Sequence, residues 1–196
     1  MGKSHNEIGP ELAAWVRAQH LFFVATAPTH GALINCSPKG LDTLRILGPR
    51  ELAYVDIGGS GIETVAHLKE NGRIVIMLCA FEGPPQIVRF HGRGAVVEPH
   101  EAGFRELLAR FAEPPMCRAI IRVEVDRVQD SCGYAVPLYG FKADRDTMPR
   151  YIAAKTEAEL RASAAKSNRR SLEGLPGLEQ DEIFLAPRST GARGGS

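Results

Sequence analysis

The segment GGSGIET, residues 58–64, places three glycines and a serine directly before an expected helix. Ser60 and Glu63 have the spacing of a capping box, in which the two side chains bind backbone N–H groups at the helix start. The glycines would also let the backbone approach an anion, because free N–H groups and the helix dipole favour negative charge at a helix N-terminus. Glu63 would repel a phosphate there, so the residue types leave both hypotheses open.

An anion at this turn needs donors from elsewhere in the chain. The segment matches neither G-x-x-x-x-G-K-S/T nor G-x-G-x-x-G, so the ordinary nucleotide-binding loops are excluded. Lys39 and Arg45, on the preceding strands and turn, can supply positive charge. Thr64 and His67 share one face of the expected helix and can add a hydroxyl and an imidazole. His67 equally fits a helix-face residue that is satisfied by a neighbour.

A second group of cations lies in the segment QIVRFHGRGAVVE, residues 86–98. Val88 and Phe90 alternate with Arg89 and His91, and Arg93 continues the basic side. A period of two puts the apolar and the basic side chains on opposite faces of a strand. The basic face is either a solvated or interfacial surface or a phosphate site, and the pattern does not choose between them.

The cysteines and histidines show no pattern of a metal or disulfide site. The four cysteines are far apart and lack C-x-x-C spacing, so neither a disulfide nor structural zinc is expected. The six histidines are scattered along the chain, and no metal site is expected from them. The anion-binding candidates therefore remain the main indication of function in the sequence.

Composition narrows the possible partners and the cellular compartment. The 196 residues carry a formal net charge of +1, which gives no general attraction for nucleic acid or anionic membrane. No apolar stretch approaches the roughly 20 residues that span a bilayer. The start MGKSHNEIGPELAAW lacks the apolar core of a secretion signal. We therefore expect a cytoplasmic protein without nucleic-acid or membrane partners.

The candidate residues must be positioned largely by strands, because strand patterns dominate the chain up to residue 130. Strands are expected at residues 21–27, 32–37, 43–47, 51–57, 73–81, 86–98 and 118–130, and helices at 10–20, 61–70 and 99–111. Strands in such close succession, with helices at the edges, favour an antiparallel barrel that closes to remove its free edges. The expected fold class is mainly β (α+β).

The composition changes at Asp144 to a charged, alanine-rich segment without strand signals. We expect helix there until about Ser171, within a C-terminal arm over residues 144–185 that packs on the barrel or on a partner subunit. The tail, residues 186–196, is rich in glycine and serine and has no apolar anchor, so disorder is expected. Residues 1–143 then form the barrel domain with its N-terminal helix.

Several segments occur in a familiar order: FFVATAP, GALINCSPKGLDTLRIL, the run from ELAYVDI to GRGAVV, and SCGYAVPLYGF. Over about residues 21–141 they resemble the pyridoxamine 5'-phosphate oxidase-like family of FMN-binding split barrels. The resemblance implies a six-stranded antiparallel split barrel that forms a homodimer. It also implies two FMN molecules, one in each cleft between the subunits, and places SCGYAVP near the flavin of the partner subunit.

The resemblance also assigns residues to the cofactor by position. The NCSPKG strand and turn would line the flavin ring and ribityl chain through Asn35, Ser37 and Lys39, and the helix start would lie near the phosphate. Lys39 and Arg89 would stabilise negative charge on the ring, with Arg89 contributed by either subunit. The remaining cofactor-binding candidates are Arg45, Ser60, Gly61, Glu63, Thr64 and His67.

The implied activity is that of an FMN-dependent oxidoreductase acting on an unidentified small molecule. Flavin chemistry requires no catalytic base, so no catalytic residue is assigned. The substrate-binding arginine and histidine of authentic pyridoxamine phosphate oxidases have no match near the C-terminus, which argues against that substrate. The alternatives are a non-catalytic flavin or haem binding or sensing protein on the same barrel, a deazaflavin binder, and a plain interaction domain.

Overall fold

The computed structural model describes residues 2, 4–31, 33–112, 114 and 116–186. Its strands are β1 (Ser4–His5), β2 (Phe22–Thr26), β3 (Asn35–Lys39), β4 (Leu44–Gly48), β5 (Glu51–Asp56), β6 (Arg73–Cys79), β7 (Ile87–Val97), β8 (Met116–Cys117), β9 (Ala119–Ser131) and β10 (Phe184–Leu185). Its helices are α1 (Pro10–Arg17), α2 (Glu63–Asn71), α3 (Phe104–Leu108), α4 (Thr147–Ala153) and α5 (Glu157–Asn168). No helix in the described part of the chain is long and apolar enough to cross a bilayer.

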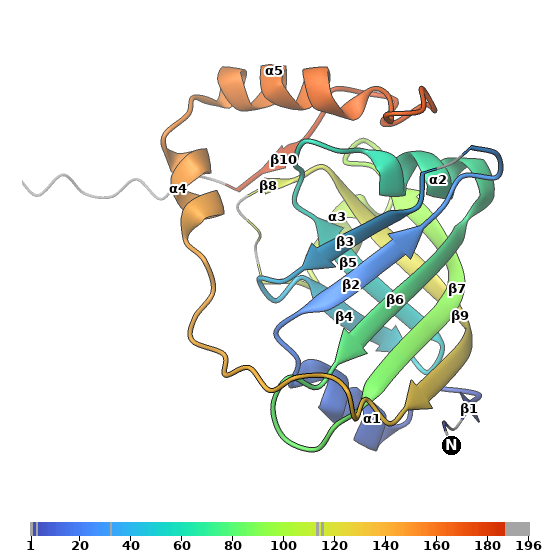
Figure 1. The fold of residues 1–196 in the computed structure, drawn as a ribbon. Coiled ribbons are helices and arrows are strands. Elements are labelled where there is room, and N and C mark those ends of the chain that lie inside the picture. The colour runs from blue at the N-terminus through green and yellow to red at the C-terminus, as the bar shows by residue number, and fades with distance from the viewer. Residues whose placement is uncertain (1, 3, 32, 113, 115, 187–196) are drawn as a thin grey trace, which may run out of the picture.

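The main sheet is antiparallel and curls into a half-open barrel (Figure 1). Its strand order is β3-β2-β6-β7-β9-β5-β4, and β1 adds to β9 beyond this path. Strands β3 and β4 are the two ends of the order and do not pair with each other, so the barrel is split between them. The prediction of an antiparallel split barrel with peripheral helices is confirmed. The sheet has eight strands, whereas the resemblance implied six: seven correspond to the strands expected from sequence patterns, and the eighth, β1, is too short to produce a pattern.

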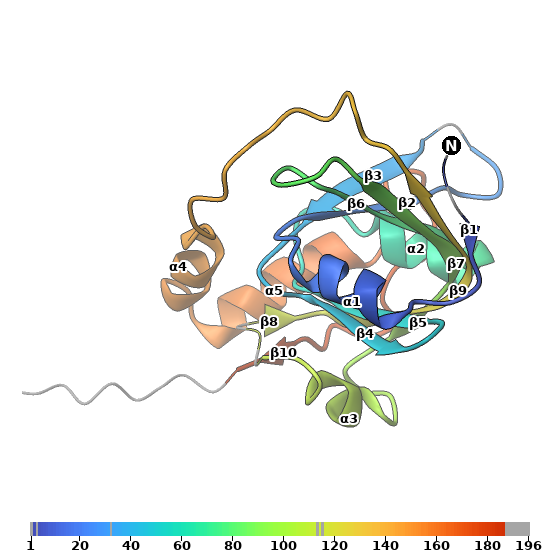
Figure 2. The ribbon, with the colours of Figure 1, turned by 90° about the horizontal axis from the view of Figure 1, so that it is seen from below.

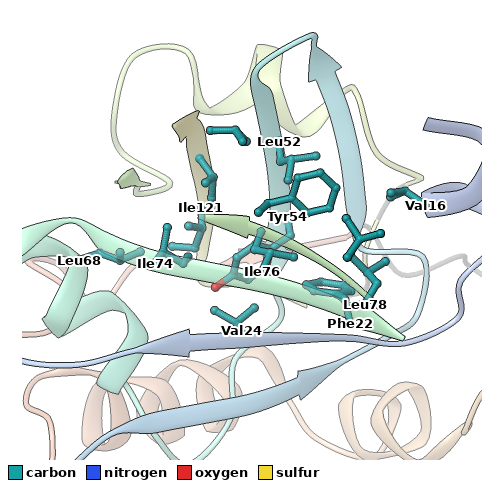
Figure 3. Close-up of a cluster of buried hydrophobic side chains, with 14 of the residues drawn as sticks. Val16, Phe22, Val24, Leu52, Tyr54, Leu68, Ile74, Ile76, Leu78 and Ile121 are labelled. Atoms are coloured by element: carbon teal, nitrogen blue, oxygen red, sulfur yellow. The ribbon is translucent and has the colours of Figure 1, made fainter. Parts of the chain in front are cut away.

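Alternating residues of the strands fill the inside of the barrel (Figure 3). Val24, Tyr54, Ile76 and Ile121 are completely buried there, and they come from four different strands. Helix α1 lies across one end of the barrel and buries Val16 against this core (Figures 2 and 3). The interior of the barrel is therefore packed with side chains, and any ligand must bind at its rim or on its outer faces.

Two glycines in the left-handed conformation set a boundary of α2 and of α3. Helix α2 starts at Glu63 and ends before Gly72, whose φ of 71° gives the left-handed conformation that stops a helix. The expected helix over residues 99–111 is reduced to α3, Phe104–Leu108, because Gly103 has φ 86° and interrupts the helical backbone before it. The early stop at Asn71 and Gly72 agrees with the sequence prediction.

The C-terminal arm contains α4, α5 and β10. Figures 1 and 2 show a long connection from β9 to α4, with α5 lying over the end of the barrel near α2. Leu160 of α5 packs with Met116 and Ile183 in a small buried cluster, and β10 pairs with β8. Helix α5 starts with a capping box of Thr156 and Glu159. The helical arm is thus observed. Its independence as a domain stays a prediction. The predicted disordered tail lies, beyond Ala186, outside the described residues.

The close approach of β7 and β9 provides a test of the fold. A Cβ atom on Gly92, at the bulge in β7, would lie 2.0 Å from the carbonyl oxygen of Glu124, so the backbone of one strand must move. We expect Gly92→Ala to lower the free energy of unfolding by about 2–3 kcal/mol, as overpacking typically does. Urea denaturation measures this change.

Gly48→Ala is the matched control. The nearest atom to its added Cβ is 3.9 Å away, and its φ is not left-handed, so the same substitution should leave stability unchanged or raise it slightly. Equal stabilities for the two variants would contradict the strand register described here.

Candidate functional site

Residues of β2, β3 and α2 form one hydrogen-bonded polar network on the inner side of the sheet edge. The Asn35 side-chain amide donates to Thr64 Oγ1 at 2.9 Å and to Thr26 Oγ1 at 3.3 Å. Thr26 Oγ1 also lies 3.0 Å from His67 Nδ1, and Ser37 Oγ donates to Asn35 Oδ1 at 3.1 Å. The sequence predictions for Asn35, Ser37, Thr64 and His67 therefore meet at one place.

The strand register explains why these residues meet. Asn35 pairs with Thr26, and Lys39 pairs with Phe22, so alternate residues of β3 share the inner face with β2. Helix α2 lies on the same side and buries Thr64 and His67. Burial lowers the pKa of His67, against the opposing charges of Glu173 and Glu63, so the imidazole is held neutral at ordinary pH. A neutral His67 acts here as a hydrogen-bonding partner that orients Thr26.

A buried ionic cluster continues this network at the end of β3. Lys39 Nζ lies 2.9 Å from Asp56 Oδ1, and Arg118 Nε donates to Asp56 Oδ2 at 3.0 Å. Arg118 Nη1 also donates to Asn168 Oδ1 at 3.0 Å, which connects the barrel to α5 of the arm. Two cations share one carboxylate, so one positive charge remains uncompensated within the cluster.

The charge state of Asp56 follows from its surroundings. Burial alone would raise the pKa of this carboxyl, but the charges of Arg118 and Lys39 outweigh it and lower the pKa from 3.8 to about 2. Nearby Tyr54 is completely buried, and burial followed by the charge of Asp56 raises the pKa of its phenol well above the ordinary value. Its hydroxyl makes no hydrogen bond among the described residues. Tyr54 therefore stays neutral while Asp56 stays ionised.

The start of α2 does not form the capping box that one of the two sequence hypotheses expects, and the hypothesis of an anion there stays a prediction. Ile62 is the N-cap residue, and no side chain caps the helix, so the capping box of Ser60 and Glu63 is not formed. Glu63 is the first helical residue, and its carboxylate accepts a hydrogen bond from Leu172 N of the arm at 3.1 Å. A Cβ on Gly61 would lie 2.3 Å from Glu63 Oε2, which shows how closely this carboxylate folds over the turn. A phosphate at this helix start would have to displace Glu63.

A cavity of about 760 Å³ lies between the rim of the barrel and the arm. On the barrel side it is lined by Gly40, Arg118 and residues 58–60, which include the predicted site residue Ser60. On the arm side it is lined by parts of α4 and α5. Its volume is within the range of small-molecule sites in proteins.

Two predicted site residues lie away from this rim within one subunit. Arg45 donates to Asp42 Oδ1 at 2.7 Å and to the carbonyl of Arg110 at 3.1 Å, and it lies over the ring of Phe111. Arg89 donates to Ser131 Oγ at 3.1 Å and faces outward, because its neighbours in β7 are buried inside the barrel. Arg89 and the Asn35 network share no hydrogen bond among the described residues of this chain.

Sequence reasoning missed three residues of the ionic cluster: Asp56, Arg118 and Asn168. Asp56 ends a strand in which every residue after Glu51 is buried, and a charge at such a position signals a buried partner. Nothing in the local sequence identifies that partner, since Arg118 is 62 positions away and belongs to a different strand pattern. Asn168 is buried, although it lies in the charged, alanine-rich arm segment, where no local pattern marks a buried polar residue.

Comparison with known proteins identifies the family of this split barrel with a polar rim. A family model for pyridoxamine 5'-phosphate oxidase matches residues 8–132. The pyridoxamine 5'-phosphate oxidase family protein ustO of Aspergillus flavus is 38% identical over 191 residues, with 89% of this chain and 77% of that protein covered. The chain belongs to the pyridoxamine 5'-phosphate oxidase family.

Solved structures agree with the fold. A HupZ variant from Group A Streptococcus has a TM-score of 0.50 and 22% identity, covering 63% of this chain and 99% of that chain. A putative pyridoxamine 5'-phosphate oxidase from Lactobacillus delbrueckii also has a TM-score of 0.50, with 19% identity over 63% of this chain and 94% of that chain. These two structures are almost completely covered by the match, but they match only 63% of this chain.

The ionic cluster predicts a specific dependence of stability on pH. Because folding lowers the pKa of Asp56, its ionised form stabilises the fold above pH 4, and this contribution of about 2 kcal/mol is lost as the pH falls through about 2. Between pH 6 and pH 3 the wild type should lose about 1 kcal/mol more than Asp56→Asn, which has no carboxyl to protonate. Urea denaturation at the two pH values measures the difference.

Asp42→Asn is the control for the loss of a carboxylate, since Asp42 is exposed and pairs only at the surface with Arg45. Its pH dependence should follow that of the wild type. An Asp56→Asn protein with the same pH dependence as the wild type would contradict the buried cluster.

Proposed function

We propose that this protein is an FMN-dependent oxidoreductase that works as a homodimer, with the flavin bound at the Asn35–Lys39 rim of each barrel. The observation that carries the proposal is the row of amide, hydroxyl and ammonium groups along the inner face of β3, in a chain that belongs to the pyridoxamine 5'-phosphate oxidase family. The substrate is a small organic molecule.

The residues at the rim fit the chemistry of FMN. The polar edge of an isoalloxazine ring makes hydrogen bonds. The N–H groups of Asn35 and the O–H of Ser37 are already donated within the network, so Asn35 Oδ1 and Ser37 Oγ are available to the ring as acceptors. A phosphate needs cations, and Lys39 is partly exposed beside the uncompensated charge of the ionic cluster. Glu63 argues against a phosphate at the helix start, so we place the phosphate nearer to Lys39 and Ser60 than to the first turn of α2.

Each residue of the rim has a separate task. Thr26, Thr64 and His67 hold Asn35 in one orientation, which gives a preorganised site. Lys39 is itself fixed by Asp56, and a fixed cation stabilises negative charge beside it without reorganisation. When bound, FMN supplies the hydride or electron transfer, so the chain needs only to bind, orient and exclude water.

The FMN site is tested by replacing its cation. Lys39→Met should weaken FMN binding by about 10- to 100-fold, because charge-assisted hydrogen bonds to phosphate contribute about 1.5–3 kcal/mol. Quenching of FMN fluorescence during titration measures the dissociation constant. Lys166→Met removes the same charge from an exposed position of α5 and should leave FMN affinity unchanged.

An equal FMN affinity for the wild type and Lys39→Met would contradict the placement of the phosphate. A wild-type protein that binds no FMN would remove the proposed function altogether. Reduction of the bound flavin by NADPH or NADH, followed by reoxidation with an acceptor, then separates an oxidoreductase from a flavin-binding protein without turnover.

The homodimer is supported by the outer face of the sheet. Phe23 and Ala25 of β2 lie beside Met77 and Val75 of β6 in the register, and these outward apolar side chains are only partly covered within one subunit. Arg89 continues the same row on β7. A second subunit on this face would cover the apolar side chains and place Arg89 at the seam.

The connection after β9 supports the same arrangement. Tyr134, Leu138 and Tyr139 are 83%, 75% and 64% exposed, although large apolar side chains are usually covered. Figures 1 and 2 show this connection running outside the barrel on its way to α4. A partner subunit would give these aromatic side chains a surface to pack on.

A charge on the outer face tests the dimer. Val75→Arg should convert a species of twice the 21.3 kDa chain mass into monomer, because an unpaired charge in an apolar interface carries a large desolvation cost. Light scattering coupled to size-exclusion chromatography measures the mass. Ala162→Arg, at an exposed position of α5, is the control and should remain dimeric.

A monomeric wild type at micromolar concentration would contradict the proposed assembly. A dimeric Val75→Arg protein would show instead that another surface joins the subunits.

A further inference from the structure

The lining of the cavity between barrel and arm combines one charged group with apolar side chains. On the barrel rim Gly59 exposes backbone and Arg118 contributes its guanidinium. The apolar part of the lining includes Tyr151 of α4 and the buried cluster of Met116, Leu160 and Ile183. A Cβ on Gly58 would lie 3.1 Å from Met116 and 3.8 Å from Arg118, so apolar surface lies directly beside the guanidinium. A ligand that matches this cavity therefore needs an apolar body and one polar group.

Helix α5 leaves this space open through its small side chains. Leu160, Ala164 and Ser167 line the cavity at the spacing of one helix face. Leu160 is buried in the apolar cluster, but the two residues that follow it along the face are too small to reach the opposite wall. Larger apolar residues at these positions would have closed the seam between arm and barrel.

Arg118 provides the polar group of the cavity. Its side chain is only 5% exposed, and its contacts engage one N–H on each nitrogen: Nε and Nη2 toward Asp56, and Nη1 toward Asn168. A guanidinium carries five N–H groups, so one on Nη1 and one on Nη2 have no partner among the described residues. A carboxylate or phosphate accepts two such hydrogen bonds at once.

The net charge around the cavity is positive only before a cofactor binds. Lys39 and Arg118 share the single carboxylate of Asp56, and the FMN phosphate that we place at Lys39 would draw on the same charge. The other charged residues of the lining, Asp144 and Arg145, are adjacent in sequence and offset each other. The preference for an anion therefore rests on the two N–H groups of Arg118 that have no partner in the described part of the chain and not on the net charge.

We infer that this cavity binds the substrate of the enzyme, as an aromatic or otherwise apolar organic molecule with one carboxylate or phosphate group held by Arg118. The assignment as substrate rests on the proposed flavin-dependent function, since the cavity adjoins the FMN rim at Gly40 and Ser60. The binding site itself rests only on the cavity and on Arg118. Helix α4, which buries none of its own residues, is the cover of this site.

The experiment compares two probes of the same shape, 2-naphthoate and its uncharged amide 2-naphthamide. Isothermal titration calorimetry on the full chain, with FMN added and its retention measured by visible absorbance, gives both dissociation constants. We expect 2-naphthoate to bind at least about tenfold more tightly, because only the carboxylate can pair with Arg118.

Gly59→Phe tests where the probe binds. A Cβ on Gly59 meets nothing within 4 Å, and its φ is not left-handed, so a side chain can enter the cavity without backbone strain. Naphthoate binding should fall by at least about tenfold in this variant. Gly9→Phe makes the same change at an equally open glycine, the N-cap of α1, and should bind naphthoate as the wild type does.

These variants keep the ionic cluster intact. Replacement of Arg118 itself would leave Asp56 buried with Lys39 alone and risks unfolding the chain. The comparison of 2-naphthoate with 2-naphthamide instead tests the role of Arg118 by removing the charge from the probe.

Three results would overturn the inference: equal affinities for the acid and the amide, wild-type affinity in Gly59→Phe, or one-for-one expulsion of FMN by naphthoate. The last result would mean that the cavity is the flavin site. A chain that binds naphthoate as expected but no FMN would refute the proposed function and the substrate assignment, while the organic-anion site would stand.

Discussion

The buried pairing of Asp56 with Lys39 and Arg118 is the constraint around which the rim of the barrel is arranged. A carboxylate this deeply buried carries a desolvation cost of several kcal/mol unless cations and hydrogen bonds surround it. Its two partners come from the edge strand β3 and from the residue between β8 and β9, so the cluster fixes the two sides of the split relative to each other. The position of Lys39, and with it the proposed FMN site, follows from this arrangement.

The same cluster connects the arm to the barrel. Asn168 accepts from Arg118, Leu172 N donates to Glu63, and Leu160 packs with Met116, so polar and apolar contacts hold the arm over the rim. The carboxylate of Glu63 therefore serves the arm instead of capping its own helix. The carboxylate of Glu63 makes the start of α2 unfavourable for an anion, whereas Lys39 and Arg118 carry positive charge. The contacts of the arm enclose the cavity between arm and rim.

The repetitive elements of the fold could be predicted from the sequence. The period of two in β7 and β9, the apolar run of β6 and the glycine after Asn71 each depend on neighbours in the chain, so the strands and the end of α2 were predicted correctly. The two-residue strands β1, β8 and β10 could not be predicted, because a pair of residues has no period and forms only where a partner strand is offered.

The site was predictable only in part, because sequence patterns report on neighbours in the chain and not on contacts between distant residues. Asn35 and Ser37 share a face of the predicted strand, as alternation indicates, and the structure brings Thr64 and His67 into their network. Lys39 was predicted in the turn after that strand, whereas β3 continues to Lys39 and places it on the same face. The ionic cluster joins residues from distant parts of the chain, and no local sequence pattern predicts such a pairing. Arg45 and Arg89 were grouped with the rim by position in the sequence, although the register turns both away from it within one subunit.

The most direct test of the account is a crystal structure of the protein grown with FMN. We expect an isoalloxazine ring beside Asn35 and Ser37 at the seam of two subunits, with the phosphate within hydrogen-bonding distance of Lys39. A flavin bound away from this rim, or two subunits joined through surfaces that exclude it, would contradict the central claim.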